Sequence, residues 1–320
     1  MKLTTTFSIP RSPYPIRAEN QILCIGSCFA ENMGSRLADL PLAVSNQAMG
    51  TLFHPLNILR ALQPQELKAE ELYKQGDNFV HPDFHSQFMG ADSTSFLAEL
   101  NTLKTNTLEF LKASQFLVIT WGTAYYYEDK VLGRAIANCH KQLPARFTKH
   151  LSSVEEICAV YEEFLRKRPF LKVIISVSPV RHTRDGMPEN SVSKAILRLA
   201  ADQLAQKFPE QVSYFPAYEI MMDELRDYRF YQADLIHPTD QAVNYIYERF
   251  KITHFDDSML EIAKRWQEIH NTLLHRPHPL QNAQHVEVLK RLRKEVEQDQ
   301  SGIDSSKLLA KIDQQILALS

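Results

Sequence analysis

Two short segments of the chain carry residue types that together can perform acyl transfer. Residues 25–30 read Ile-Gly-Ser-Cys-Phe-Ala, which places Ser27 among small residues directly after an apolar run. Residues 234–237 read Asp-Leu-Ile-His, so a carboxylate and an imidazole lie three positions apart. A serine becomes a nucleophile when a histidine accepts its proton, and an acid orients that histidine. These residue types predict a triad of Ser27, His237 and Asp234.

Apolar runs that alternate with helical spacing predict the elements that position these residues. Such alternation is typical of a parallel sheet covered by helices on both faces, with ligands bound beyond the carboxyl ends of the strands. Ser27, residues 122–124 and residues 178–182 all follow predicted strands, so we expect them to share one crevice. The predicted strands are 22–26, 116–120, 173–177 and 212–215, and the predicted helices are 28–40, 107–113, 153–167, 191–207 and 239–250.

The character of the sequence changes after residue 256. Residues 257–274, 282–298 and 304–319 have helical spacing, many charges and few glycines. We therefore expect an α/β domain over residues 1–255 and a helical extension over residues 256–320, which packs on the sheet domain or on another subunit. The terminal helices offer a surface for a homodimer.

Composition excludes several classes of protein. The 320 residues are 44% hydrophobic with a net charge of −2, and no long run of lysine and arginine marks a surface for nucleic acid or anionic lipid. The four cysteines form no CxxC pair, so a structural zinc site of thiolates is not expected. No segment approaches the ~20 apolar residues that span a bilayer, and the first residues lack a secretory signal. We expect a soluble cytoplasmic protein with reduced thiols.

The sequence resembles a known family. Residues 26–30, Gly-Ser-Cys-Phe-Ala, are the namesake motif of the GSCFA domain family, which is similar to the wider SGNH/GDSL hydrolases. The Asp-x-x-His pattern at 234–237 is similar to the late motif that supplies acid and base in those enzymes. The segments 138–140, 178–182 and 214–231 also resemble the family.

The resemblance extends over about residues 20–250 and implies a fold and an activity. The implied fold is a three-layer α/β/α, flavodoxin-like parallel sheet with the nucleophilic serine just after the first strand. The implied activity is ester hydrolysis through an acyl-serine, with a small acyl group such as acetate on a carbohydrate-like alcohol as substrate. We expect no cofactor and no metal.

The family pattern also implies donors for an oxyanion. The candidates are the backbone N–H groups of Ser27 and Gly50. The third donor in SGNH enzymes is an asparagine in a Gly-x-Asn block, but this chain has Gly-Thr-Ala at 122–124. The Thr123 hydroxyl or the Asn46 side chain is the expected substitute. Gly50 is equally well explained as a turn glycine.

Further residues are candidates for contact with substrate, each beside a structural interpretation. Trp121 and the tyrosines at 125–127 suit stacking on a sugar ring, although packing is the commoner role of such aromatics. Arg181 and His182 suit an anionic substrate group or an ion pair that shapes the loop. The other candidates are His85, Asn138 and His140. A histidine-rich crevice also raises a metal site, which Pro82 between His81 and His85 and the lack of an HExxH pattern disfavour.

Four functions follow from these patterns and from the resemblance. The first is a serine esterase, and the second is an O-acyltransferase that uses the same triad. The third is a non-catalytic module that binds a glycan or acyl ligand. The fourth is a metal-dependent hydrolase that uses the histidines. Ser27 also suits the N-cap of a helix, and Cys28 is an alternative nucleophile.

Overall fold

The computed structural model describes residues 4–275, 278, 282–298 and 304–319. Its centre is a five-stranded sheet in the order β10-β9-β5-β1-β2, and every pairing in it is parallel. In chain order, this is the 2-1-3-4-5 order of flavodoxin-like sheets. The strands are β1 (Gln21–Gly26), β2 (Ala43–Asn46), β5 (Phe116–Trp121), β9 (Lys172–Val177) and β10 (Val212–Tyr214).

The three inner strands are buried along nearly their whole length. All six residues of β5, and all but the first residue of β1 and of β9, are buried. Strands buried on both faces read as continuous apolar runs, which is why the sequence predicts them. Edge strand β2 has no buried residue and gives no such signal.

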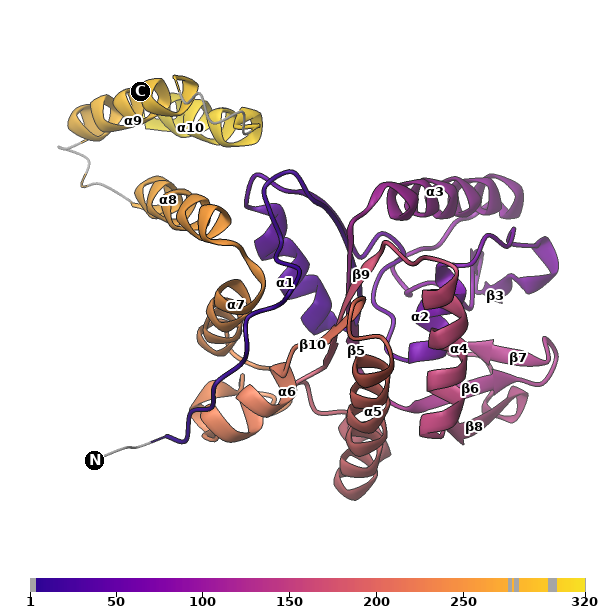
Figure 1. The fold of residues 1–320 in the computed structure, drawn as a ribbon. Helices are drawn as coiled ribbons and strands as arrows, with labels where there is room; N and C mark the ends of the chain where they lie inside the picture. Colours follow the sequence, from indigo (N-terminus) through magenta and orange to yellow (C-terminus); the bar gives the residue numbers. More distant parts are fainter. Residues whose placement is uncertain (1–3, 276–277, 279–281, 299–303, 320) are drawn as a thin grey trace.

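Helices cover both faces of the sheet, giving the expected three-layer α/β/α arrangement (Figure 1). On one face Phe29 and Leu37 pack with Ile246 and Phe250, and on the other Leu100 packs with side chains of α2, α4 and α5. Each such side chain, fully buried, stabilises the fold by about 1.5–3 kcal/mol. The first face holds α1 (Cys28–Ala38) and α7 (Asp240–His254); the second holds α2 (Pro55–Ala61), α3 (Ser93–Ala113), α4 (Val154–Arg166) and α5 (Met187–Lys207).

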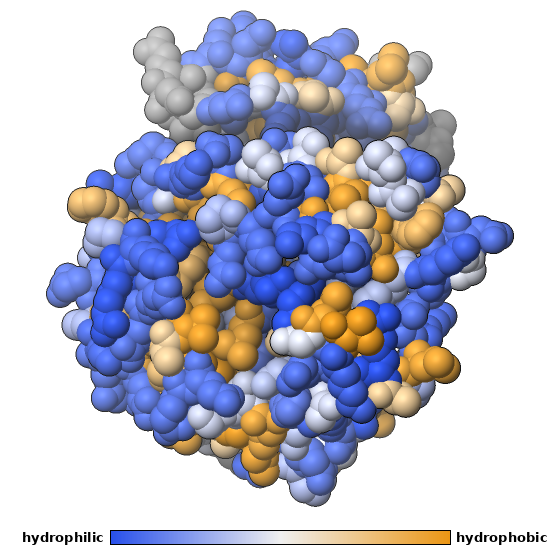
Figure 2. Space-filling model, turned by 90° about the vertical axis from the view of Figure 1, so that its right-hand side faces the viewer, coloured by the Kyte–Doolittle hydropathy of each residue, from blue (hydrophilic) through white to orange (hydrophobic). Residues whose placement is uncertain are grey.

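Two small antiparallel sheets lie outside this central unit, and the sequence patterns did not reveal either. They occupy the same side of the molecule in Figure 1, and in Figure 2 that side is mainly hydrophilic with separate apolar patches. Isolated apolar side chains of this kind are normal on a protein surface. The first sheet pairs β3 (Tyr73–Gln75) with β4 (Asn78–Val80), and the second has β6 (Tyr125–Asp129) between β7 (Arg134–Ile136) and β8 (Phe147–Leu151).

Short helical turns complete the α/β part of the chain. Helix α6 (Ala217–Glu219) continues into a π-helical turn, Ile220–Glu224. Single 3₁₀ turns span Ala69–Glu71, Pro144–Arg146, Thr183–Asp185 and Tyr228–Phe230.

Three helices follow the α/β part, as the sequence predicts. Asp256 caps α8 (Asp257–Leu274) by accepting a hydrogen bond from the Met259 N–H. Helices α9 (Asn282–Glu297) and α10 (Ser306–Leu319) pack against each other and against α8 around a separate apolar cluster that includes Trp266, Leu289 and Ile312. Lys311 also forms an ion pair with Asp39 of the α/β part at 3.1 Å. A homodimer through these helices stays a prediction.

Candidate active site

The turn between β1 and α1 holds Ser27 at the carboxyl end of the sheet. Gly26 has a φ of +138°, and a Cβ there would overlap the Thr120 carbonyl oxygen, so only glycine fits. The Ser27 N–H donates to that same oxygen at 2.9 Å. This bond joins the turn to β5, the neighbouring strand. Because chain connections leave β1 and β5 in opposite directions along the sheet, Ser27 lies at its topological switch point.

Ser27 occupies the N-cap position of α1, but its side chain makes no capping hydrogen bond. The residue is 1% exposed, and its Oγ has no hydrogen-bond partner among the described residues. A buried polar atom without a partner is uncommon and calls for a functional or structural reason. Ser27 therefore does not cap α1 through its hydroxyl, which was the structural role that the sequence suggested.

A buried glutamine fixes the carbonyls of this turn. The Gln47 Nε2 donates to the Gly26 and Ser27 carbonyl oxygens, each at 3.0 Å, and its Oε1 accepts from the Gly26 N–H at 3.4 Å. Gln47 is 8% exposed and has a φ of +51°. Sequence reasoning missed this residue, because nothing in its spacing distinguishes it from a surface glutamine.

The segment after Gly50 crosses the strand ends beside Ser27. The Leu52 N–H donates to the Gly26 oxygen at 2.7 Å, and the Phe53 oxygen accepts from the Gly122 N–H at 2.7 Å. The Phe53 ring meets the His182 ring edge-on, with centroids 6.1 Å apart. Residues that follow β1, β5 and β9 therefore meet in one region, as the sequence predicts.

Asp234 and His237 form a preorganised pair. The His237 Nδ1 lies 2.6 Å from the Asp234 Oδ2, while the Asp234 Oδ1 accepts from the backbone N–H groups of Ile236 and His237 at 2.9 and 3.0 Å. These bonds, with the imidazole bond the largest contribution, lower the pKa of Asp234 to about 2. Leu235 has a φ of +60°, a conformation that turns the chain back so one carboxylate reaches all three donors.

Arg181 attaches this loop to the segment that follows β9. Its backbone N–H and its Nη1 donate to the Ile236 and Leu235 carbonyl oxygens at 3.3 and 3.0 Å. Its guanidinium also lies over the Tyr231 ring, 4.0 Å from the centroid. These contacts support the interpretation of Arg181 as a loop-shaping residue, but they do so through carbonyls and a ring rather than an ion pair.

The two parts of the candidate triad belong to strands that are not neighbours. Strand β5 separates β1, which leads to Ser27, from β9, whose following segment holds the loop of His237. Two strand spacings amount to roughly 10 Å, which the two side chains must span above β5. Among the described residues, Ser27 Oγ has no hydrogen bond to His237 or to any other group.

The four expected oxyanion donors are engaged elsewhere in this structure. The Ser27 N–H bonds to Thr120, and the Gly50 N–H donates to the Gln47 oxygen at 2.7 Å in a turn where Gly50 has a φ of +75°. The Thr123 hydroxyl lies 3.1 Å from the Ser193 Oγ and accepts from the Tyr125 N–H. The Asn46 Nδ2 donates to α1, through the Glu31 oxygen and the Ser35 hydroxyl. The expectation that these donors face the crevice therefore requires correction.

Trp121 was expected to contact substrate, and the structure contradicts this. Its side chain is 0% exposed, and its Nε1 donates to the buried Tyr161 hydroxyl at 2.7 Å. Trp121 is the last residue of β5, so its ring points into the layer between sheet and helices rather than into solvent.

Three other candidates for substrate contact have structural roles in the structure. His140 is buried, burial lowers its pKa, and its Nε2 lies 2.8 Å from the His81 oxygen. The Asn138 side chain accepts from the His140 N–H at 2.9 Å. His85 packs beside Gly50, and a Cβ added to Gly50 would overlap the Cβ of His85. Of the substrate candidates, Arg181 and His182 remain beside the strand ends.

Comparison with known proteins identifies the family. The model of the GSCFA family matches residues 21–250, which is most of the chain. The chain belongs to the GSCFA family. No curated protein and no solved structure matches it. The match covers β1 to α7, and therefore Ser27, Asp234 and His237.

The part of this GSCFA protein that the structure describes contains no helix long and apolar enough to cross a membrane.

All four cysteines are free, and Cys28, the alternative nucleophile, is partly buried. Burial is the main effect on the Cys28 thiol and raises its pKa. The thiol is thereby held in its protonated, weakly nucleophilic form at neutral pH.

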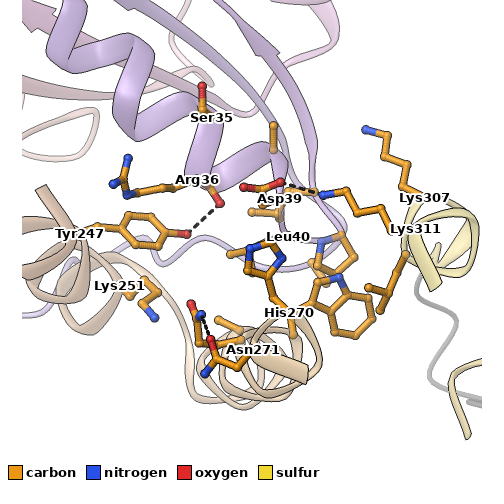
Figure 3. A pocket seen from close by; sticks show the side chains of 18 of the residues that line it. Ser35, Arg36, Asp39, Leu40, Tyr247, Lys251, His270, Asn271, Lys307 and Lys311 are labelled. Carbon is orange, nitrogen blue, oxygen red and sulfur yellow. Dashed lines mark hydrogen bonds and ion pairs between the residues drawn. The ribbon is translucent and has the colours of Figure 1, made fainter. Parts of the chain in front are cut away.

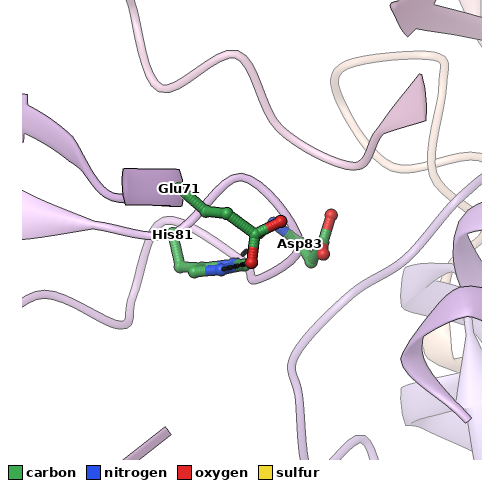
Figure 4. Close-up of side chains that lie close together, drawn as sticks. All are labelled: Glu71, His81 and Asp83. Carbon is green, nitrogen blue, oxygen red and sulfur yellow. Dashed lines mark hydrogen bonds and ion pairs between the residues drawn. The ribbon is translucent and has the colours of Figure 1, made fainter. Parts of the chain in front are cut away.

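A cluster of Glu71, His81 and Asp83 has the residue types of a metal site (Figure 4). However, Arg134 binds both carboxylates, at 2.5 Å to Glu71 and 2.7 Å to Asp83, and Arg60 binds Asp83 at 3.0 Å. The His81 Nδ1 accepts from the Asp83 N–H, so the Nε2, 3.7 Å from Glu71, carries the proton. Neither nitrogen keeps a lone pair for a metal, so the cluster fits a buried ion-pair network.

A cavity of about 1350 Å³ lies at the opposite end of α1 from Ser27 (Figure 3). Its walls combine α1, α7, α8 and α10, and include Arg36, Tyr247 and Trp266. Ser35, the first α1 residue that lines this cavity, is eight positions after Ser27, so the cavity starts about 12 Å along the helix axis from Ser27. It therefore belongs to the junction with the C-terminal helices and not to the candidate active site.

Proposed function

We propose that this GSCFA protein is a serine ester hydrolase in which Ser27 is the nucleophile. The observation that carries the proposal is the Asp234–His237 pair. Its 2.6 Å contact at Nδ1 leaves Nε2 of the imidazole to accept a proton. The Ser27 hydroxyl at the switch point supports it, since no hydrogen bond occupies that group in the part of the chain that the structure describes.

The proposal includes a relationship to the SGNH/GDSL hydrolases. Three features support it: the 2-1-3-4-5 strand order, a serine directly after the first strand, and an Asp-x-x-His loop near the end of the α/β part. Fold likeness alone is a weak guide to activity, so the chemistry of the site carries the argument.

The reaction proceeds in two steps. Ser27 Oγ attacks the acyl carbon of an ester while His237 takes the hydroxyl proton and then passes it to the leaving alcohol. Water, activated by His237, then releases the acyl group from Ser27. Asp234 holds the imidazole in the required tautomer and stabilises its charged form. Since Ser27 is buried, binding of substrate requires the segments over the strand ends to shift; catalytic hydrogen bonds often tighten only in such complexes.

The proposed substrate is an ester of a small acyl group, such as acetate, with a carbohydrate-like alcohol. Arg181 and His182 lie beside the loop of His237, and this position supports a role for them in contact with the alcohol part. If an alcohol replaces water in the second step, the same residues perform acyl transfer.

A second candidate function is a non-catalytic module that binds a glycan or acyl ligand. A specific observation favours it: the four expected oxyanion donors make other hydrogen bonds, and Ser27 is 1% exposed. In this alternative, the strand ends form a binding surface in which the serine hydroxyl has no reactive role.

Hydrolysis of p-nitrophenyl acetate by wild type, Ser27→Ala and Ser176→Ala separates the two functions. Ser176 is a matched control, because it is a buried serine at the same end of the sheet whose Oγ bonds to Thr120 at 2.9 Å. The esterase proposal predicts a loss of about 10³-fold or more in Ser27→Ala and near wild-type activity in Ser176→Ala. Equal rates for all three proteins would favour the binding module. A fourth protein, Cys28→Ala, tests the thiol. Loss of hydrolysis in Cys28→Ala but not in Ser27→Ala would identify the thiol as the nucleophile.

A further inference from the structure

A buried lysine lies beneath the candidate active site. Lys194, on α5, is 2% exposed. Its Nζ donates to the Gly122 oxygen at 2.7 Å and to the Ser178 oxygen at 2.8 Å. These two carbonyls belong to the first residues after β5 and β9. One side chain therefore joins the two segments that follow the central strands.

Lys194 has no acidic partner among the described residues. An ammonium group has three N–H donors, and its two bonds to carbonyls leave the third without an acceptor in the described part of the chain. Burial lowers the pKa of Lys194 to about 7. The neutral amine, with two N–H groups, would satisfy both carbonyls without a buried charge, so the proton is retained most easily when negative charge is near.

Groups from α1, from the segment after β9 and from α6 lie near Lys194. Cys28 at the start of α1 and His182 after β9 are close enough for Lys194 to affect their pKa values. The Tyr218 ring of α6 has its centroid 5.9 Å from Nζ. Arg198, one turn later on α5, is paired with Glu219 at 2.9 Å.

We propose that Lys194 is a positioning residue of the candidate active site: it holds the segments after β5 and β9 together, and its protonated form supports the oxyanion formed at Ser27. The inference rests on the proposed function. In the supported step, Ser27 Oγ bonds to the acyl carbon, the carbonyl π electrons move to oxygen, and the Ser27 proton passes to His237. Lys194 gives up no proton in this step.

The two hydrogen bonds of Lys194, called the tether below, also affect the position of His237. The Ser178 segment continues to Arg181, which bonds the loop that carries Asp234 and His237. Loss of the Lys194 bonds therefore loosens the placement of the imidazole relative to Ser27. A misplacement of about 1 Å in such a site costs about 10²-fold in rate.

The charge of Lys194 gives the activity a pH signature. A lysine is charged below its pKa, so its contribution is present at low pH and is lost as the pH rises through about 7. Its neighbours do not produce the same signature. Burial raises the pKa of Cys28 and of Tyr218 and lowers that of His182, so it moves all three pKa values away from pH 7. A falling limb near pH 7 is therefore assigned to Lys194.

The test compares wild type, Lys194→Met, Lys194→Gln and Ser27→Ala in p-nitrophenyl acetate hydrolysis from about pH 5.5 to about pH 9, with thermal unfolding measured alongside. Lys194→Met removes tether and charge, and is expected to lower kcat about 10²-fold with KM within about threefold. Lys194→Gln keeps N–H donors for the carbonyls, and is expected to recover about tenfold of that loss. Neither variant should show the falling limb.

Two results would overturn the inference. One is a wild-type profile with no falling limb near pH 7, which decides the matter even if Lys194→Met does not fold. The other is a folded Lys194→Met or Lys194→Gln with wild-type kcat and pH profile. If hydrolysis depends on Ser27 but not on Lys194, the inference alone fails. If Ser27→Ala equals wild type, the proposed function fails and the inference fails with it.

Discussion

The substitution Gln47→Met tests whether the turn that holds Ser27 is positioned by one buried amide. It removes two donated hydrogen bonds, to the Gly26 and Ser27 carbonyl oxygens, each 3.0 Å long, and a longer bond of 3.4 Å that Gln47 Oε1 accepts from the Gly26 N–H. Both carbonyls keep other donors, since Leu52 bonds to Gly26, and the first turn of α1 bonds to Ser27. No buried acceptor is orphaned, so each donated bond accounts for about 1 kcal/mol, and the expected loss in the free energy of unfolding is at least about 2 kcal/mol.

Gln211 provides a control at the other end of the sheet. It is 7% exposed, and its Nε2 donates to the Leu165 and Arg168 carbonyl oxygens at 3.2 and 2.6 Å. Gln211→Met should therefore lose a similar free energy of unfolding, again about 2 kcal/mol. Because Gln211 precedes β10, it lies at the amino end of the sheet, away from Ser27.

The assay measures urea unfolding and the rate at which a fluorophosphonate probe labels Ser27. Gln47→Met should label about 10- to 100-fold more slowly than wild type, because the backbone turn that carries Ser27 is no longer fixed by the two bonds to its carbonyl oxygens. Gln211→Met should label at the wild-type rate despite its similar loss of stability. Equal labelling rates in the two variants would refute the idea that Gln47 positions the nucleophile.

Three further predictions concern single residues. Asp234→Asn keeps an acceptor for the backbone N–H groups of the loop but removes the charge beside His237, so the rate of hydrolysis should fall about 10³-fold or more while the thermal unfolding temperature stays unchanged. Asp234→Ala should lower both the rate and the unfolding temperature. Full activity in Asp234→Asn would contradict the triad. Gly26→Ala places a Cβ against the Thr120 carbonyl at a φ that only glycine adopts readily. It should lower the free energy of unfolding, measured in urea, by about 3 kcal/mol or more. An unchanged free energy of unfolding would contradict the close contact. Burial raises the pKa of Glu71, but the hydrogen bonds from Arg134 and the nearby His81 imidazole outweigh it and hold that pKa below its usual range. Glu71 therefore stabilises the fold fully above the unfolded value of about 4.3 and loses this contribution as the pH falls toward its folded pKa. Glu71→Gln should flatten that decline in stability, and an unchanged pH profile would contradict this prediction.

The central sheet could be predicted because its inner strands are buried on both faces. The run Phe116–Trp121 is apolar except for Thr120, and its ends were placed to within a residue. Edge strand β2 and the sheet around β6 are half-exposed and carry neither a continuous run nor a clear alternation. The first half of α3, from Ser93, was also missed, because its polar residues hide the helical spacing that residues 107–113 retain.

The candidate site was predictable only where residues lie close in sequence. The Asp234–His237 pair follows from a three-residue spacing, because one short loop presets both groups. Roles that depend on distant partners were not predictable. The Tyr161 hydroxyl that receives the Trp121 N–H is 40 positions away, and the two carbonyls that bind Lys194 lie 72 and 16 positions away. A lysine or tryptophan carries no sequence signal for such bonds.

The most direct test of the proposed function is the location of a fluorophosphonate adduct by mass spectrometry. The probe forms a covalent bond only with an activated nucleophile. The account predicts that the adduct lies on Ser27 in wild type, is lost in His237→Ala, and is retained in Ser176→Ala. A wild-type protein that takes up no probe, or takes it up at another residue while Ser27 stays unmodified, would contradict the account.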